Sequence, residues 1–274
     1  KNLVIFNDGL KYRDHIENHR LTRNEIVKFK KENKIEIIFS KKNLTQKNNL
    51  PYALQKVFDK FDKAIILEDD CIPNKSFFKF CHLLLEKFEN DSRIAQISGN
   101  NFLNSSKNFK RRNNDSYYFS KFTSSWGWAT WKSRWRETYD TNMNLWPEVK
   151  KQKWLKDILQ NKNAYLFWTK YFDRRYKMQD DDWDKPWTFV NFINNRLSIF
   201  PTKNLISNIG DDEYAIHKNP KKWDSLKLEE MKFPLTHPKI ISQDVNVDNF
   251  LTENGFRIPK ISSRLKNKIK SLFN

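Results

Sequence analysis

The chain has 274 residues, of which 38% are hydrophobic, so it can bury a sizeable core and its composition disfavours intrinsic disorder. No run of about 18 apolar residues occurs, so no membrane-spanning helix is expected. The net charge of +18 comes from lysines scattered over the whole chain, and no nucleic-acid-binding motif accompanies it. We therefore expect no nucleic-acid partner. Cys71 and Cys81 form no disulfide or zinc pattern, which favours a cytoplasmic setting.

Short β-branched runs alternate with helical periods in the first half of the chain. Strands are expected at 3–6, 35–39, 64–67 and 94–97, and helices at 13–31, about 52–61 and 77–88. This alternation predicts an α/β fold whose sheet is mostly parallel and covered by helices on both faces.

The pattern changes after Gly99. A polar loop is expected at 101–116, a strand at 117–119, an aromatic stretch at 126–131, helices from 147 to about 195, and a strand at 197–200. The remaining tail is basic and interrupted by prolines. With no repeat or low-complexity linker, we predict one domain over residues 1–220 and a basic C-terminal extension over 221–274.

Three adjacent carboxylates, Glu68, Asp69 and Asp70, follow the apolar residues at 64–67. Such a cluster at the end of a buried strand is electrostatically costly unless a cation compensates it. Ligands of open α/β sheets bind at the carboxyl ends of strands, and oxygen ligands suit Mg²⁺ or Mn²⁺. The alternative interpretation is a solvated acidic turn after an edge strand.

The Glu68-Asp69-Asp70 stretch, with the Ile-Pro and Phe-Phe pairs that follow it, resembles the metal-binding motif of GT-A glycosyltransferases. It is most similar to the N-acetylglucosaminyltransferase I type and to related bacterial sugar transferases. The resemblance spans roughly residues 3–217 and continues through Ile97–Asn101, Trp126–Trp128, Trp183-Asp184, Trp187, Asn204–Gly210 and His217. It implies a Rossmann-like GT-A fold with a mixed sheet flanked by helices.

The same resemblance implies an activity. The enzyme would be a metal-dependent, inverting hexosyl- or N-acetylhexosaminyltransferase. Its donor would be a nucleotide-diphosphate sugar, and its acceptor a glycan or lipid-linked glycan of polysaccharide biosynthesis. Asp70 and His217 would hold Mn²⁺ or Mg²⁺, and Glu68 and Asp69 would support the ion and contact the ribose. Asp8 would face the base or ribose, although a plain turn after the first strand explains it equally well.

An inverting transfer needs a carboxylate that takes the proton of the acceptor hydroxyl group. By resemblance this base is Asp184, because the family places it after a Trp at the start of a helix; Asp182 remains a rival, and helix capping is the alternative role. We expect Trp126 and Gly127 to line the donor site and Trp131 to lie in the core.

In the family, a further strand with a nucleotide-binding loop precedes the segment that begins here, so this chain is expected to lack the first strand. Residues 261–273 have the pattern of a basic amphipathic helix, which suggests peripheral binding to the inner face of a membrane or ordinary docking on the domain. Two other functions stay open. One is a nucleotidyltransferase, and the other is an inactive basic protein that binds glycan or nucleic acid.

Overall fold

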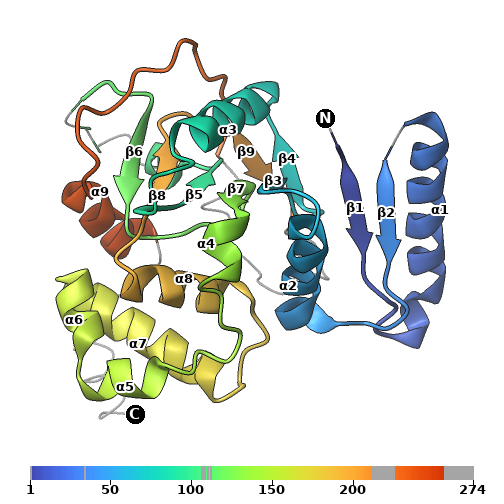
Figure 1. The fold of residues 1–274 in the computed structure, drawn as a ribbon, viewed down its shortest axis with the longest axis horizontal. Helices are drawn as coiled ribbons and strands as arrows, with labels where there is room; N and C mark the ends of the chain where they lie inside the picture. The colour runs from blue at the N-terminus through green and yellow to red at the C-terminus, as the bar shows by residue number, and fades with distance from the viewer. Residues whose placement is uncertain are drawn as a thin grey trace, which may run out of the picture.

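The computed structural model describes residues 2–33, 35–105, 109, 111, 113–210 and 226–255. A five-stranded mixed sheet lies at its centre with helices packed on both faces (Figure 1). The strand order across this sheet is β3 (Lys63–Ile66), β7 (Trp128–Trp131), β5 (Ile94–Ser98), β8 (Leu197–Pro201) and β6 (Tyr117–Ser120). The α/β class and the mixed sheet predicted from the sequence are confirmed.

The prediction that the sheet would be mostly parallel is wrong for this central sheet. Of its four described pairings, only β5–β8 is parallel, and β3–β7, β5–β7 and β6–β8 are antiparallel. The antiparallel strands β6 and β7 come from the part of the chain after Gly99, where the alternation of strands and helices stops. A parallel neighbour needs a long crossover, usually a helix, whereas an antiparallel one does not.

Two hydrophobic cores lie on opposite faces of this sheet. Helix α3 covers one face, and its Phe77 and Leu84 are fully buried there. Helix α8 covers the other face with Trp187. Along β5, Ile94 enters the first core and Ala95 the second, as the two-residue period of a strand requires. The helices of these layers are α3 (Lys75–Lys87), α4 (Lys132–Arg136), α5 (Trp146–Lys151), α6 (Trp154–Leu159), α7 (Lys162–Tyr176) and α8 (Asp184–Ile193).

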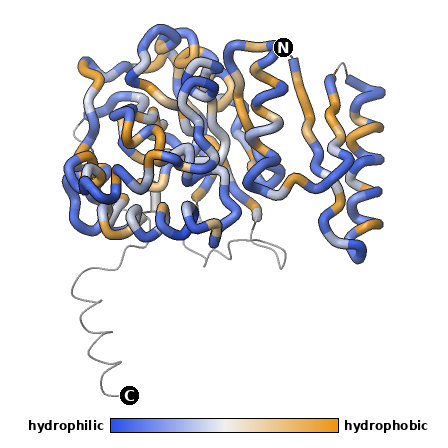
Figure 2. Tube along the Cα trace, turned by 60° about the horizontal axis from the view of Figure 1, so that its bottom comes forward, coloured by the Kyte–Doolittle hydropathy of each residue, from blue (hydrophilic) through white to orange (hydrophobic). Residues whose placement is uncertain are grey.

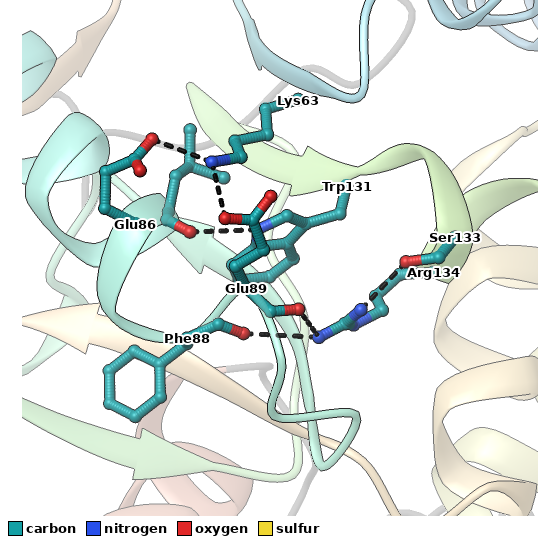
Figure 3. A network of polar contacts seen from close by, with 8 residues as sticks. Lys63, Glu86, Phe88, Glu89, Trp131, Ser133 and Arg134 are labelled. Atoms are coloured by element: carbon teal, nitrogen blue, oxygen red, sulfur yellow. Dashed lines mark hydrogen bonds and ion pairs between the residues drawn. The ribbon is translucent and has the colours of Figure 1, made fainter.

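Charged side chains fix the end of α3 against the sheet and α4 (Figure 3). Lys63 of β3 pairs with Glu86 at 2.8 Å and with Glu89 at 2.9 Å. The buried Arg134 guanidinium donates to the carbonyl oxygens of Phe88 and Glu89, at 3.2 and 2.7 Å. These bonds satisfy carbonyl groups that a helix C-terminus leaves without intrahelical partners. The ion pairs of Lys63 hold the first residue of β3 in place. The carboxylate stretch follows the other end of this strand.

The first 60 residues form a parallel two-stranded unit with one helix on each face. Arg23 of α1 donates to Asn7 Oδ1 at 2.9 Å and to the Ser40 carbonyl at 2.7 Å, which ties the carboxyl ends of both strands together. On the other face, the ring of Tyr52 of α2 packs against the ring of Phe6, with 5.6 Å between their centroids. Figure 2 shows the two strands as hydrophobic beside the mainly hydrophilic α1. The elements are β1 (Val4–Asn7), η1 (Arg13–His15), α1 (Ile16–Glu32), β2 (Glu36–Phe39) and α2 (Thr45–Phe58).

Helix α2 links this unit to the central sheet. Besides its contact with Phe6, it buries Leu54 and Phe58 in the core that contains Ile66 of β3. Within the described residues, β1 pairs only with β2 and β3 pairs only with β7. The expectation that this chain lacks the first strand of the family stays a prediction.

The remaining described elements pack onto this framework. The amide of Met231 donates to Ser76 Oγ at 3.0 Å, so the described part of the basic extension, residues 226–255, contacts α3. Both cysteines are free and buried. No helix among the described residues combines the length and apolar character needed to cross a bilayer. The elements are β4 (Cys71–Pro73), η2 (Phe102–Ser105), β9 (Ile206–Asn208), α9 (Val245–Phe250) and the π-helical turn η3 (Leu251–Gly255).

Candidate active site

The carboxylate stretch forms the turn between β3 and β4. The amide of Cys71 donates to the Glu68 carbonyl at 3.1 Å, which closes the turn. The amide of Ile209 donates to the Asp70 carbonyl at 2.9 Å, so the segment after β9 holds the turn from the other side. Asp69 is exposed, whereas Glu68 and Asp70 are half-buried. The backbone of all three residues is therefore held at the carboxyl end of β3, as the sequence predicted.

A hydrogen bond joins this turn to the start of α8. Trp183 Nε1 donates to Glu68 Oε1 at 3.0 Å across 115 residues of sequence. Burial raises the pKa of Glu68 to about 8, this hydrogen bond opposes the rise, and the charges of Asp70, Asp184 and Asp69 add to it. Three of the main contributions to the pKa of Glu68 come from neighbouring carboxylates. The site is thus an acidic cluster that a bound cation would relieve.

The two candidate bases have different surroundings. Asp182 is buried and pairs with Lys185, whose ammonium group also lies 2.8 Å from Asp180. Asp184 is half-buried and is the first residue of α8, after Trp183 at the N-cap. The partial positive charge of a helix N-terminus favours an ionised carboxylate there. Asp182 is therefore part of a buried ion pair, and Asp184 is the carboxylate that acts electrostatically on Glu68.

Trp183 is held in place by aromatic stacking. Its ring lies on that of Trp128 with 5.4 Å between centroids and an angle of 15° between planes. Trp128 is fully buried and also contacts Trp135 and Trp187. This packing fixes the indole N–H toward Glu68. The sequence placed Trp183 in a motif but gave no sign of its contact, because the contact depends on the packing of α8 against β7.

Gly127 lies beside the end of β3. Its φ of +57° is in the left-handed region, and a Cβ atom would lie 2.5 Å from Ile206 Cδ1 and 3.3 Å from Leu67 Cδ2. Only glycine fits this conformation and this space without strain. These contacts place Gly127 near the carboxylate turn, and its predicted place in the lining of a donor site stays a prediction. Trp126 is half-buried against Phe102, with centroids 5.3 Å apart.

Two further residues of the predicted motifs, Trp131 and Gly210, are tightly packed. Trp131 is buried in the core, and this prediction is confirmed. A Cβ atom at Gly210 would lie 2.6 Å from Asp70 Oδ2, so Gly210 lets the chain approach this carboxylate closely. The sequence gave Gly210 no role of its own, and the structure shows its amide donating to Asn208 Oδ1 at 2.9 Å.

Asp8 anchors the end of β1. Its Oδ1 and Oδ2 accept the amide of Leu44 at 3.0 and 3.1 Å, and Oδ1 accepts the amide of Gly9 at 2.8 Å. These bonds join the loops that follow β1 and β2. A hollow of about 280 Å³ opens beside them, lined by residues that include Lys11 and His19. The contacts support the turn role of Asp8, and a nucleotide contact stays a prediction.

The described part of the chain contains no group of three His, Cys, Asp or Glu side chains arranged to hold a metal ion. This does not conflict with Mg²⁺ or Mn²⁺ chemistry, because such an ion is often held by one or two carboxylates plus substrate phosphates. The oxygen donors of Glu68, Asp69 and Asp70 suit these ions. His217 and the predicted helix at 261–273 lie outside the described residues.

No protein-family model matches the chain, and no curated protein matches it. The residues of this site are therefore the ground for assigning a function.

Proposed function

We propose that the chain is a GT-A-fold, metal-dependent inverting glycosyltransferase that uses a nucleotide-diphosphate sugar. The observation that carries the proposal is the hydrogen bond between Trp183 Nε1 and Glu68 Oε1. It brings the start of α8, and with it Asp184, next to the carboxylate turn at the end of β3. One acidic group beside a carboxylate cluster is the arrangement that a metal-assisted transfer needs.

The roles are divided between the turn and the helix. Asp70 would hold Mn²⁺ or Mg²⁺ with support from Glu68 and Asp69, and the bound ion would offset the negative charge of the leaving diphosphate. Asp184 takes the proton from the acceptor hydroxyl group as the oxygen attacks the anomeric carbon. Asp184 is preferred to Asp182, since Asp184 acts electrostatically on Glu68 of the carboxylate turn, whereas Asp182 lies in a buried ion pair with Lys185.

Gly127 and Trp126 would line the donor side of this site. The buried Gly127 lets the backbone pack tightly against Ile206 and Leu67 beside the end of β3. Asp8 and the hollow after β1 would accommodate the nucleoside. The acceptor is a glycan or a lipid-linked glycan, and the reaction takes place in the cytoplasm, where lipid-linked acceptors are reached from the inner face of the membrane.

The first test is a thermal-shift measurement with UDP-, GDP-, CMP- and dTDP-sugars, each with and without Mn²⁺. We expect one nucleotide class to stabilise the chain only when Mn²⁺ is present, and Asp70→Ala to abolish this shift. The matched control is Asp62→Ala, which removes a carboxylate that is 82% exposed at the other end of β3. Stabilisation that persists in Asp70→Ala would contradict the assigned site.

A product assay separates the transferase from a nucleotidyltransferase. The proposed reaction releases a nucleoside diphosphate, whereas a nucleotidyltransferase releases pyrophosphate. Asp184→Asn should retain the Mn²⁺-dependent donor shift and lower transfer by about 100-fold or more, since a positioned general base contributes roughly 100- to 10,000-fold. Unchanged transfer in Asp184→Asn would exclude Asp184 as the base.

A further inference from the structure

Trp154 is unusually exposed for a tryptophan of this chain. It is the first residue of α6 and is 51% exposed, while every other described tryptophan is buried or half-buried. The neighbouring Leu155 and Leu159 are buried and anchor α6 on the domain. Because these leucines hold the inner side of the helix, Trp154 is kept on the outside. A large indole ring in water loses the free energy that its burial would provide.

The backbone before Trp154 is unusual as well. Lys153, at the N-cap of α6, has a φ of 60° and a ψ of 20°, which is the left-handed region that lysine rarely adopts. Its amide donates to the Lys150 carbonyl at 3.2 Å, and its carbonyl accepts the amide of Lys156 at 2.9 Å. The turn between α5 and α6 is therefore closed by these two bonds despite its strain. Strained backbone of this kind persists where the surrounding structure holds it.

Lysines surround the exposed ring. Residues 150–156 contain four lysines, and the exposed acidic residues Glu148 and Asp157 lie on either side of this stretch. Lys150 pairs with Asp173 at 2.7 Å, whereas Lys151, Lys153 and Lys156 are exposed and make no ion pair with any described residue. We call Lys151, Lys153, Trp154 and Lys156 the α5–α6 corner. It combines an exposed amphipathic ring with three exposed lysines that form no ion pair among the described residues.

We propose that the α5–α6 corner binds the surface of an anionic phospholipid bilayer. Trp154 inserts at the level of the headgroups, where an indole ring meets both apolar and polar surroundings. The three lysines attract the anionic headgroups, each one at close range adding to the binding. Charge complementarity favours this occupant, since the corner presents three exposed lysines and the chain carries a net charge of +18. The site is separate from the predicted helix at 261–273 and does not depend on the proposed transfer activity.

The experiment is co-sedimentation of the full chain with vesicles of phosphatidylcholine alone and of phosphatidylcholine mixed with phosphatidylglycerol. We expect binding only to the mixed vesicles, and weaker binding at higher salt. The first variant, Lys151→Gln with Lys153→Gln and Lys156→Gln, should weaken binding by about 100-fold, or about fivefold for each lysine. The second, Trp154→Ser, should weaken it by about tenfold.

Matched controls test whether the effect belongs to this corner. Replacing Lys28, Lys30 and Lys31 of α1 by Gln removes the same charge from another exposed surface. Tyr12→Ser removes an aromatic ring that is 52% exposed. Both controls should keep the affinity of the unchanged chain.

Three results would overturn the proposal. One is that the corner does not support binding, seen either as no binding to the mixed vesicles or as binding that the corner variants leave unchanged. Another is weaker binding of heparin or an oligonucleotide by the corner variants while vesicle binding persists, which would assign the corner to a soluble polyanion. The third is a dimer in sedimentation equilibrium that Trp154→Ser dissociates without affecting vesicle binding, which would assign the corner to a second copy of the chain.

Discussion

Replacing Glu68 by Gln should stabilise the chain in alkaline solution and change little in acid. The pKa of Glu68 is about 8 in the folded chain, against an ordinary value of 4.5. The folded state thus keeps a proton that the unfolded state loses, so the stability of the unchanged chain falls as the pH rises from 4.5 to about 8 and is level above that. The amide side chain introduced by Glu68→Gln cannot ionise, and its carbonyl oxygen still accepts the Trp183 N–H.

The size of the effect follows from the two pKa values. At about 1.36 kcal/mol per pH unit, the ionised carboxylate costs the folded state up to about 5 kcal/mol. Glu68 is partly exposed, so solvent screening lowers the cost of its ionised form. We therefore expect Glu68→Gln to raise the free energy of unfolding at pH 9 by roughly 2 to 5 kcal/mol. Urea denaturation of both proteins at pH 5, 7 and 9, without added metal, measures the difference in free energy of unfolding.

The control for this experiment is Glu32→Gln, which removes an exposed carboxylate on α1. It should alter the free energy of unfolding by less than about 0.5 kcal/mol at each pH. A Glu68→Gln effect of equal size at pH 5 and pH 9 would refute the reasoning, because it would show that the carboxyl group of Glu68 ionises as freely in the folded chain as in the unfolded one.

Three further changes test the packing around the site. Gly127→Ala should lower the free energy of unfolding by about 2 to 5 kcal/mol, from left-handed strain and the clash with Ile206; a loss below about 1 kcal/mol in urea denaturation would contradict this. Lys185→Met removes the ammonium group that pairs with the buried Asp182 and should cost about 3 to 5 kcal/mol, and adding Asp182→Asn should recover part of it in thermal melts. Burial raises the pKa of Asp248 to about 6, so stability should fall by about 3 kcal/mol between pH 3.8 and 6, and Asp248→Asn should remove that fall.

The sequence located the carboxylate turn because its signal is local. An apolar run that ends in three carboxylates sets both the strand and its exit, and β3 with Glu68, Asp69 and Asp70 lies as predicted. The same is true of α3, where Asn74 accepts the Ser76 amide at 2.8 Å and caps an apolar helical period. Local propensity and hydrophobic period agree in both places.

By resemblance the sequence favoured Asp184 as the base, but it left Asp182 as a rival. Both lie in one acidic run, and the difference between them is set by Lys185, which turns its ammonium group to Asp182 and Asp180. Lys185 lies three positions after Asp182, and the two side chains meet only once the start of α8 is fixed. That start, at Asp184, depends on the packing of Trp183 against Trp128.

By itself, the sequence determined the α/β class, most of the strands and helices, and the place of the acidic turn, because hydrophobic period and chain connectivity are encoded over a few neighbouring residues. Only the tertiary structure decided the antiparallel pairing of β6 with β8 and of β7 with β3 and β5, the exposure of Trp154 and the bond from Trp183 to Glu68. Each of these joins or separates residues far apart in the chain. Their contacts depend on how helices and strands pack together, which no local pattern specifies.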